Sequence, residues 1–147
     1  MSMRIREMTA KDIPSVLPLY IAYYNEHEDG CWNELTAKKR IGQVLDTNDF
    51  YGLIAENENS VLGFAMGYFK QYDDIVGYTL DEIVIDSECQ NKGIGSMLIK
   101  ELEQRVKAKG ASCVELQAVN DEMHEHFYGK LGYKNAENFV LKVKWFE

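Results

Sequence analysis

Apolar and charged residues alternate from Met3 to Met8, which is typical of a strand with one buried face. Three further stretches are strand-like: Phe50 to Glu56, Val61 to Phe69 and Tyr78 to Ile85. Only the polar run NENS separates the second stretch from the third, which favours a hairpin of antiparallel strands. The pattern therefore predicts an early strand and a later antiparallel meander.

Helices are expected between the first strand and the meander. Thr9 followed by Asp12 has the spacing of a capping box, which predicts a helix that runs to about Tyr24. A shorter helix is predicted from Thr36 to Leu45. The polar segment between these helices, Asn25 to Asn33, is typical of a loop.

The period of the apolar positions changes after Gly93. Apolar residues then follow at four-residue steps, at Ile94, Leu98, Leu102 and Val106. This spacing places them on one side of a helix and predicts that this side is buried.

A glycine at position 110 ends this helix, and short elements follow it. We predict a strand from Cys113 to Val119, a helix from Met123 to Lys130, and one or two strands within Tyr133 to Phe146. This order of elements predicts an α/β fold of the mixed α+β kind, with helices on both faces of one sheet. The 147 residues fit a single domain.

Composition narrows the range of partners. The chain has 16 Lys and Arg against 24 Asp and Glu, a net charge of −8, which argues against nucleic acid or an anionic membrane as the main partner. Cys31, Cys89 and Cys113 show no metal-binding spacing, so we expect reduced thiols, a cytoplasmic location and no metal site. No apolar run approaches the roughly 20 residues of a membrane span, and the start MSMRIRE lacks the apolar stretch of a signal peptide.

The segment IVIDSECQNKGIGSMLIKELE predicts a strand, a short glycine-bearing turn and then a helix. Gly93 and Gly95 allow close backbone approaches, and the start of a helix carries partial positive charge, so this turn suits a phosphate. Lys92 and Ser96 could add further contacts. The spacing is neither the dinucleotide GxGxxG nor an ATPase P-loop. A turn of this kind with no ligand is the alternative.

The turn resembles the acyl-CoA signature of the GNAT superfamily, in which Arg or Gln is followed by xxGxG or xxGxA, and QNKGIG at Gln90 to Gly95 matches it. Two further segments match, VELQAVN at Val114 to Asn120 and HFYGKLGYK at His126 to Lys134. The resemblance implies a mixed, mostly antiparallel sheet of about seven strands, splayed near its middle, with about four flanking helices. It also implies an N-acetyltransferase that moves an acetyl group from acetyl-CoA to a primary amine by direct attack in a ternary complex.

The resemblance also implies residues that bind acetyl-CoA. Main-chain groups of Ile83, Val84 and Ile85 would face the thioester and the pantetheine arm, between that strand and the one at Cys113 to Val119. The pyrophosphate would lie on Gln90, Asn91, Lys92, Gly93, Ile94, Gly95 and Ser96. Asn120 and Tyr128 complete the set, although they are one residue further apart than in many members.

Acetyl transfer to an amine needs a base for the amine and an acid for the departing thiolate. The resemblance makes Tyr128 the candidate acid. Glu82, beside the thioester, and Glu115, where some N-terminal acetyltransferases have a glutamate, are candidate bases, and bulk water is a third possibility. Strand alternation places Asp81 on the face opposite to Glu82.

The loop between the first two helices contains acidic and aromatic residues, so we expect Tyr24, Glu28 and Trp32, together with Glu82, to receive a cationic amine, and an ordinary solvated turn is the alternative. The acceptor is expected to be a small cationic amine or a protein amine. We also expect a homodimer formed through the aromatic-rich last strands. The alternative function is a regulatory module that binds acyl-CoA without transferring the acyl group.

Overall fold

The structure is a computed structural model that describes residues 2–147. It divides into two compact units, one up to Gln117 and the other Ala118–Glu147. The first unit contains β1 (Arg4–Glu7), η1 (Ala10–Asp12), α1 (Ile13–His27), α2 (Glu34–Leu45), β2 (Phe50–Glu56), β3 (Val61–Gln71), β4 (Val76–Ile85), η2 (Ser87–Cys89), α3 (Ile94–Ala108) and β5 (Ala111–Leu116). The second unit contains α4 (Glu122–Lys130).

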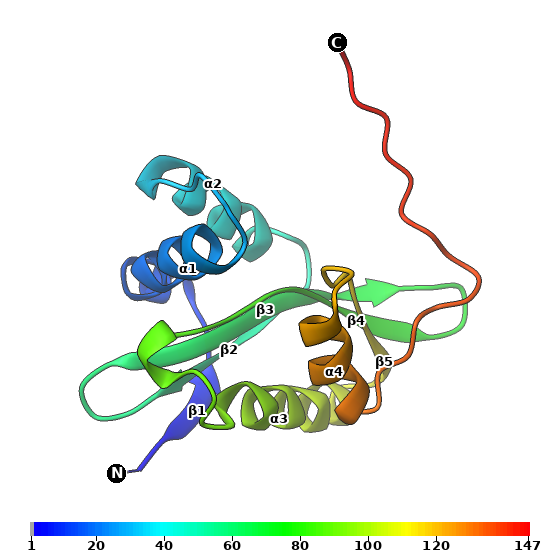
Figure 1. Cartoon of the computed structure of the whole chain (residues 1–147). Coiled ribbons are helices and arrows are strands. Elements are labelled where there is room, and N and C mark those ends of the chain that lie inside the picture. Colours follow the sequence, from blue (N-terminus) through cyan, green and yellow to red (C-terminus); the bar gives the residue numbers. More distant parts are fainter. Residues whose placement is uncertain (1) are drawn as a thin grey trace. The chain divides into compact units, whose positions relative to one another are not determined.

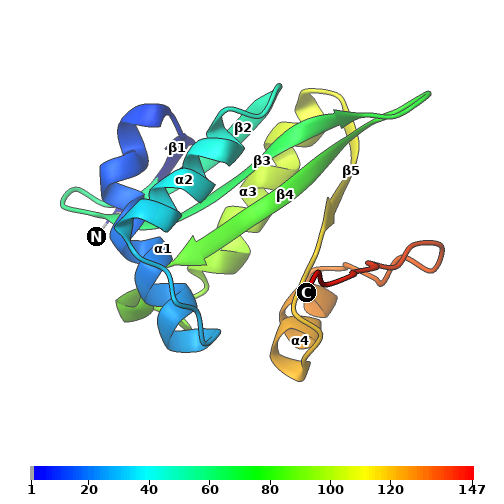
Figure 2. The same ribbon diagram turned by 90° about the horizontal axis from the view of Figure 1, so that it is seen from above.

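The sheet of the first unit has the strand order β1-β2-β3-β4-β5. Neighbours are antiparallel from β1 to β4, as the hairpin pattern predicts, whereas β4 and β5 are parallel. A parallel pair needs a crossover connection, and α3 supplies it. Helices α1 and α2 cover one face of the sheet and α3 covers the other (Figure 1, Figure 2). The mixed α/β fold class is confirmed.

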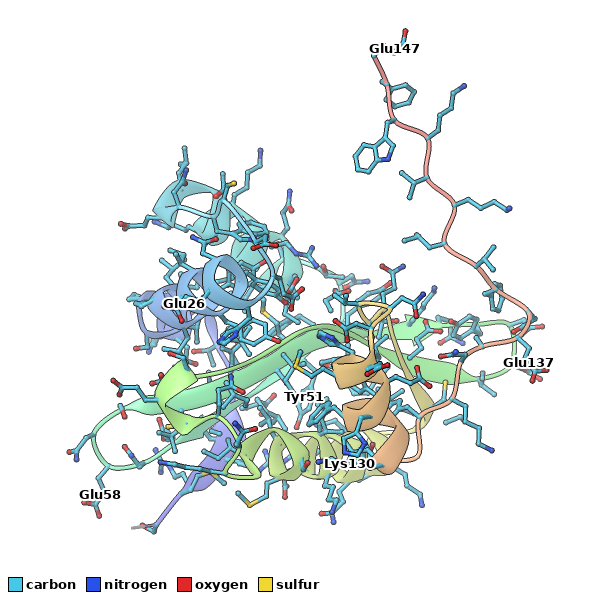
Figure 3. The ribbon with its side chains drawn as sticks, viewed as in Figure 1. Glu26, Tyr51, Glu58, Lys130, Glu137 and Glu147 are labelled. Carbon is cyan, nitrogen blue, oxygen red and sulfur yellow. The ribbon has the colours of Figure 1, made fainter. Side chains whose placement is uncertain are left out.

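Each face of the sheet has its own apolar core. The core beneath α1 and α2 includes Phe64 of β3 and Val84 of β4. The core beneath α3 includes Tyr51 of β2, seen on that face in Figure 3. The four apolar residues predicted to line one side of α3 are all buried there: Ile94, Leu98, Leu102 and Val106.

A β-bulge interrupts the pairing of β3 with β4. Met66 lies opposite Glu82 and the next residue, Gly67, lies opposite Leu80, so Asp81 is an extra residue with no partner on β3. A bulge of this kind bends the strand and changes which face the following side chains reach.

The bulge reverses the alternation of β4. Leu80 belongs to the α3 core before it, and Ile83 packs on the same core after it, although the two residues are an odd number of positions apart. Val84, and Glu82 with it, therefore face α1 and α2. Without the extra residue, Glu82 would point into the α3 core.

The count of strands differs from the prediction. The described residues form five strands, not about seven, because no strand forms in the C-terminal segment where Tyr133 to Phe146 predicts one or two. That segment is extended, with Glu137 and Glu147 marked in Figure 3, and its large apolar side chains are exposed. Its alternation suits a strand, but a strand also needs a hydrogen-bonding neighbour, and the pattern does not supply one.

Candidate active site

The turn after β4 is fastened to the end of that strand. The Gln90 side chain donates through Nε2 to the carbonyl oxygen of Ile85, 3.0 Å away. The Asp86 carboxylate accepts a hydrogen bond from the Glu88 N–H at 3.1 Å. Gln90, predicted to bind the pyrophosphate, therefore braces the turn from within.

Two left-handed residues shape the rest of the turn. Asn91 has φ 63° and Gly93 has φ 78°, and Gly93 is the N-cap of α3. The first helical bond runs from the Met97 N–H to the Gly93 carbonyl at 3.0 Å, so the preceding amides point out of the helix start. No atom lies within 4 Å of the place where a Cβ on Gly93 would be. The turn thus combines open space with amides that suit an anion.

One edge of β4 beside this turn has no strand next to it in the first unit. Pairing with β5 ends where Leu80 meets Leu116, whereas β3 continues along the opposite edge as far as Ile85. Apart from the Ile85 carbonyl oxygen, which accepts from Gln90, the main chain of β4 from Asp81 to Ile85 has no strand partner on its β5 side within the first unit. Ile83, Val84 and Ile85, predicted to face the pantetheine arm, all lie in this stretch.

Glu82 joins three elements on the α1 and α2 face. The Tyr24 hydroxyl of α1 donates to its Oε1 at 2.5 Å, and Nε of Arg40 on α2 donates to its Oε2 at 3.1 Å. The Glu82 side chain is 9% exposed and that of Arg40 is 34% exposed. The carboxylate is therefore nearly buried, but its cationic partner reaches solvent.

Burial sets the proton affinity of this carboxyl. Desolvation raises the pKa of Glu82 above its ordinary value, and the negative charge of Asp81 adds to this, while Tyr24 and Arg40 act in the opposite direction. Burial also raises the pKa of Asp81, and the charge of Arg40 lowers it in part. Asp81 is the extra residue of the bulge, and its charge acts on both Arg40 and Tyr78 of the α3 core, so its position on the face opposite to Glu82 stays a prediction.

Aromatic rings surround Tyr24. Tyr20 and Trp32 meet edge to face with their centroids 4.9 Å apart, and the Tyr20 and Tyr24 centroids are 4.7 Å apart. The Asn25 side chain holds the Trp32 backbone by two hydrogen bonds, of 2.8 and 2.9 Å. The charge of Glu28 contributes to the raised pKa of Tyr24, so Glu28 lies near this cluster. Tyr24, Glu28 and Trp32, predicted to bind substrate, are thus together.

Glu115 has a different environment. It accepts hydrogen bonds from Tyr72 at 2.7 Å and from Thr79 at 3.0 Å, and Lys70 lies 3.6 Å away. Burial raises the pKa of Glu115, but the hydrogen bonds from Tyr72 and Thr79 and the charge of Lys70 outweigh it, so the pKa is lowered. Its side chain is 41% exposed. At neutral pH Glu115 is a more weakly basic carboxylate than Glu82.

A sequence model of the acetyltransferase (GNAT) family matches residues 13–133. This chain belongs to the GNAT family. Among curated relatives, YxbD of Bacillus subtilis (strain 168), an uncharacterized protein, is 29% identical over 100 residues, which cover 67% of this chain and 58% of YxbD. The uncharacterized N-acetyltransferase YhfO of the same organism is 26% identical over 144 residues, 94% of each chain.

Solved structures share the GNAT fold. The aminoglycoside N-acetyltransferase AAC(6')-Iy in complex with CoA has a TM-score of 0.76 at 17% identity, with 97% of this chain and 95% of that chain covered. A ribosomal-protein-alanine N-acetyltransferase from Brucella melitensis biovar Abortus 2308 has a TM-score of 0.78 at 16% identity, covering 99% of this chain and all of that one (100%).

The second unit of this GNAT chain contains the remaining predicted residues. Tyr128 lies on α4, where its ring packs against Phe127 and Tyr133 with centroids 5.0 and 5.8 Å apart. Asn120 is exposed and lies just before Asp121, which caps α4 by accepting from the His124 N–H at 2.8 Å. The roles of Tyr128 and Asn120 stay predictions.

Arg40 was not predicted from the sequence as a site residue. Its helix shows a buried stripe of Ala37, Ile41 and Val44, and Arg40 lies at the border of that stripe. A lone arginine beside an apolar stripe is a weak signal, because such residues often extend into solvent. Within residues 2–147 we find no group of three or more His, Cys, Asp or Glu side chains suited to a metal ion, and no helix long and apolar enough to cross a membrane.

Proposed function

We propose that this protein is an N-acetyltransferase that moves the acetyl group of acetyl-CoA to a primary amine by direct attack in a ternary complex. The observation that carries the proposal is the position of Glu82. It is a buried carboxylate on the strand whose free edge and following turn suit acyl-CoA. The buried Glu82 carboxylate, the unpaired edge of β4 and the turn that suits an anion follow one another along one stretch of the chain.

Acetyl-CoA supplies the acetyl group as a thioester. The open turn fits its pyrophosphate, because the amides that start α3 are free of helical bonds and Gly93 leaves space in front of them. The edge of β4 from Ile83 to Ile85, which has no strand partner on its β5 side within the first unit, would face the pantetheine arm, and a backbone N–H near Val84 would stabilise negative charge on the reacting carbonyl oxygen. The family resemblance supports Asn120 and Tyr128 as further acetyl-CoA-binding residues of this proposal.

Glu82 is the base in this mechanism. A raised pKa makes a carboxylate a better proton acceptor near neutral pH, and Glu82 has it whereas Glu115 does not. Glu82 takes the proton of the incoming ammonium, directly or through a water molecule. The Tyr128 phenol gives a proton to the departing thiolate.

The acceptor is a cationic amine, either a small molecule or a group on a protein. The cluster of Tyr20, Tyr24 and Trp32, with Glu28 beside it, offers the aromatic rings and negative charge that attract an ammonium group. The similar structures include an enzyme named for aminoglycosides and another named for a ribosomal protein alanine, so both acceptor classes belong in the test.

The direct test measures free thiol released from acetyl-CoA across a panel of amines: a polyamine, an aminoglycoside, a lysine peptide and a peptide with a free N-terminus. We expect thiol release that depends on one of these classes, with the acetylated amine detected by mass spectrometry. Tight CoA binding without amine-dependent release would instead identify the regulatory module that binds acyl-CoA.

In this proposal the enzyme is a cytoplasmic homodimer that pairs through its C-terminal segment. That segment exposes six large apolar residues: Phe139, Val140, Leu141, Val143, Trp145 and Phe146. Soluble monomers rarely leave such a run uncovered, and an extended unpaired segment is a template for another strand. Light scattering should give twice the mass of the chain, and truncation after Glu137 should give a monomer. A single-chain mass for the intact protein contradicts the dimer.

A further inference from the structure

We infer that Arg40 is a positioning residue for the transfer: its guanidinium fixes the Glu82 carboxylate and keeps it charged for proton abstraction. The inference rests on the proposed function, because it assigns Arg40 a role only if Glu82 is the base. Its geometric support is the contact of Arg40 Nε with Glu82 Oε2 at 3.1 Å, from a residue 42 positions away in the chain.

The buried Glu82 carboxylate needs a cation beside it. Glu82 is only 9% exposed, and an ionised carboxylate without a partner is costly to bury. Tyr24 donates one hydrogen bond but carries no positive charge. Within the described residues, Arg40 is the cation that forms an ion pair with Glu82.

Charged and titratable groups from α1, α2 and β4 face Glu82. Tyr24 and Tyr20 approach from α1, Asp81 from β4, and Arg40 from α2. Asp81 is anionic and opposes ionisation of Glu82, while the tyrosines are kept neutral because burial raises the pKa of each. Arg40 therefore carries the positive charge that offsets both desolvation and Asp81.

Arg40 also orients the carboxylate. Its Nε donates to Glu82 Oε2, and its guanidinium lies close enough to Tyr20 to affect the pKa of that phenol. The planar guanidinium holds one carboxylate oxygen, and Tyr24 holds the other. Glu82 is thereby held in one orientation, and Arg40 is the more exposed member of the pair.

The test is the dependence of kcat/KM on pH for the wild type, Arg40→Gln and Arg40→Lys. All three are measured with the same amine, so that the titration of the amine affects every pH profile equally. A base must be deprotonated, so activity falls as pH falls through the pKa of Glu82. Without the Arg40 cation the pKa of Glu82 rises, because an opposite charge at this distance lowers the pKa of a carboxyl group by about one unit or more. We expect the acid limb of Arg40→Gln to move up by roughly one pH unit or more.

Arg40→Lys keeps the charge but not the planar contacts. It should keep the acid limb near the wild-type position while kcat falls, because a point charge does not fix the carboxylate in one orientation. Calorimetry should give unchanged CoA affinity for both variants, since Arg40 lies on α2 and the proposed pyrophosphate site lies at the start of α3.

Arg105→Gln is the matched control. Arg105 is as exposed as Arg40, 32% against 34%, and also pairs through Nε with a glutamate, Glu101, at 2.8 Å, but on α3. Its acid limb should not move. An unchanged limb in Arg40→Gln, or an equal shift in Arg105→Gln, would overturn the inference. If Arg40→Gln does not fold, the inference is decided by Arg40→Lys, where an unchanged kcat overturns it. Absence of amine-dependent turnover in the wild type would instead remove the proposed function.

Discussion

Gly67 lies outside the candidate site but next to the bulge that orients Glu82, so we expect alanine at this position to change both stability and activity. A Cβ at Gly67 would lie 1.8 Å from the carbonyl oxygen of Thr79 and 3.0 Å from the Tyr78 hydroxyl. The Thr79 oxygen is backbone and cannot rotate away as a flexible side chain can. The two strands must therefore separate or shift register beside the bulge at Asp81.

Inserting an atom into packed structure costs about 1–3 kcal/mol, and an obstacle made of backbone favours the upper part of that range. We expect Gly67→Ala to lower the free energy of unfolding by this amount. The matched control is Gly42→Ala in α2, where no atom lies within 4 Å of the new Cβ. Alanine is the better helix former by roughly 0.5–1 kcal/mol, so this control should be stabilised.

Urea denaturation of both variants measures these changes, and acetyl transfer by the folded fraction reports on Glu82. Because the bulge turns Glu82 toward α1 and α2, a shift of register in Gly67→Ala should also slow the transfer, whereas Gly42→Ala should not. Equal stability of Gly67→Ala and the wild type, with equal rates, would refute the reasoning that the close approach at Gly67 sustains the bulge.

Three further predictions concern the turn, the proposed acid and the ion pair of Arg6 with Asp12. Gly93→Val should abolish CoA binding by calorimetry, because valine is strained at φ 78° and fills the space in front of the helix start; unchanged affinity in a folded variant would contradict the turn as the pyrophosphate site. Tyr128→Phe should slow the chemical step by roughly 100- to 10,000-fold if the phenol transfers a proton, and a loss below about tenfold in single-turnover kinetics would reduce it to a hydrogen-bond donor. Asp12 is paired with Arg6 at 2.7 Å. Burial raises the pKa of Asp12, but the hydrogen bonds from Arg6 and from the Thr9 N–H and the charge of Arg6 outweigh burial, so the pKa lies below its ordinary value. Its contribution to stability is therefore complete above the ordinary Asp pKa of about 3.9 and is lost as pH falls through the lower folded value. Thermal unfolding should accordingly find Asp12→Asn less stable than the wild type at pH 7, with the difference narrowing under acid, and a difference that does not depend on pH would contradict the pairing.

Local periodicity was enough to predict most elements of the first unit. The strands of the meander and the helix after Gly93 are set by neighbours in the sequence, and their bounds agree with the structure within a few residues. The turn was also predictable, because Gly93 and Gly95 lie between a strand-like run and an amphipathic helix and allow a tight backbone turn. The left-handed conformation of Asn91 has no such signal, since asparagine is common in ordinary loops.

What the sequence could not give depends on contacts between distant residues. The bulge at Asp81 reflects a close approach between Gly67 and another strand, so alternation alone assigns Glu82 to the wrong core. Arg40 meets Glu82 across 42 residues, and nothing local marks the pair. The C-terminal segment alternates like a strand but has no strand partner in its own unit.

The central claim is that Glu82, and not Glu115, accepts the proton of the amine. Its most direct measurement compares the kcat of Glu82→Gln and Glu115→Gln at saturating acetyl-CoA, with the amine that the panel identifies. The account predicts a loss of roughly 100- to 10,000-fold for Glu82→Gln, as removal of a proton carrier typically causes. For Glu115→Gln it predicts a loss below about tenfold, the size of a missing hydrogen bond. A kcat near the wild-type value for Glu82→Gln, together with a large loss of kcat for Glu115→Gln, would contradict this claim and identify Glu115 as the base.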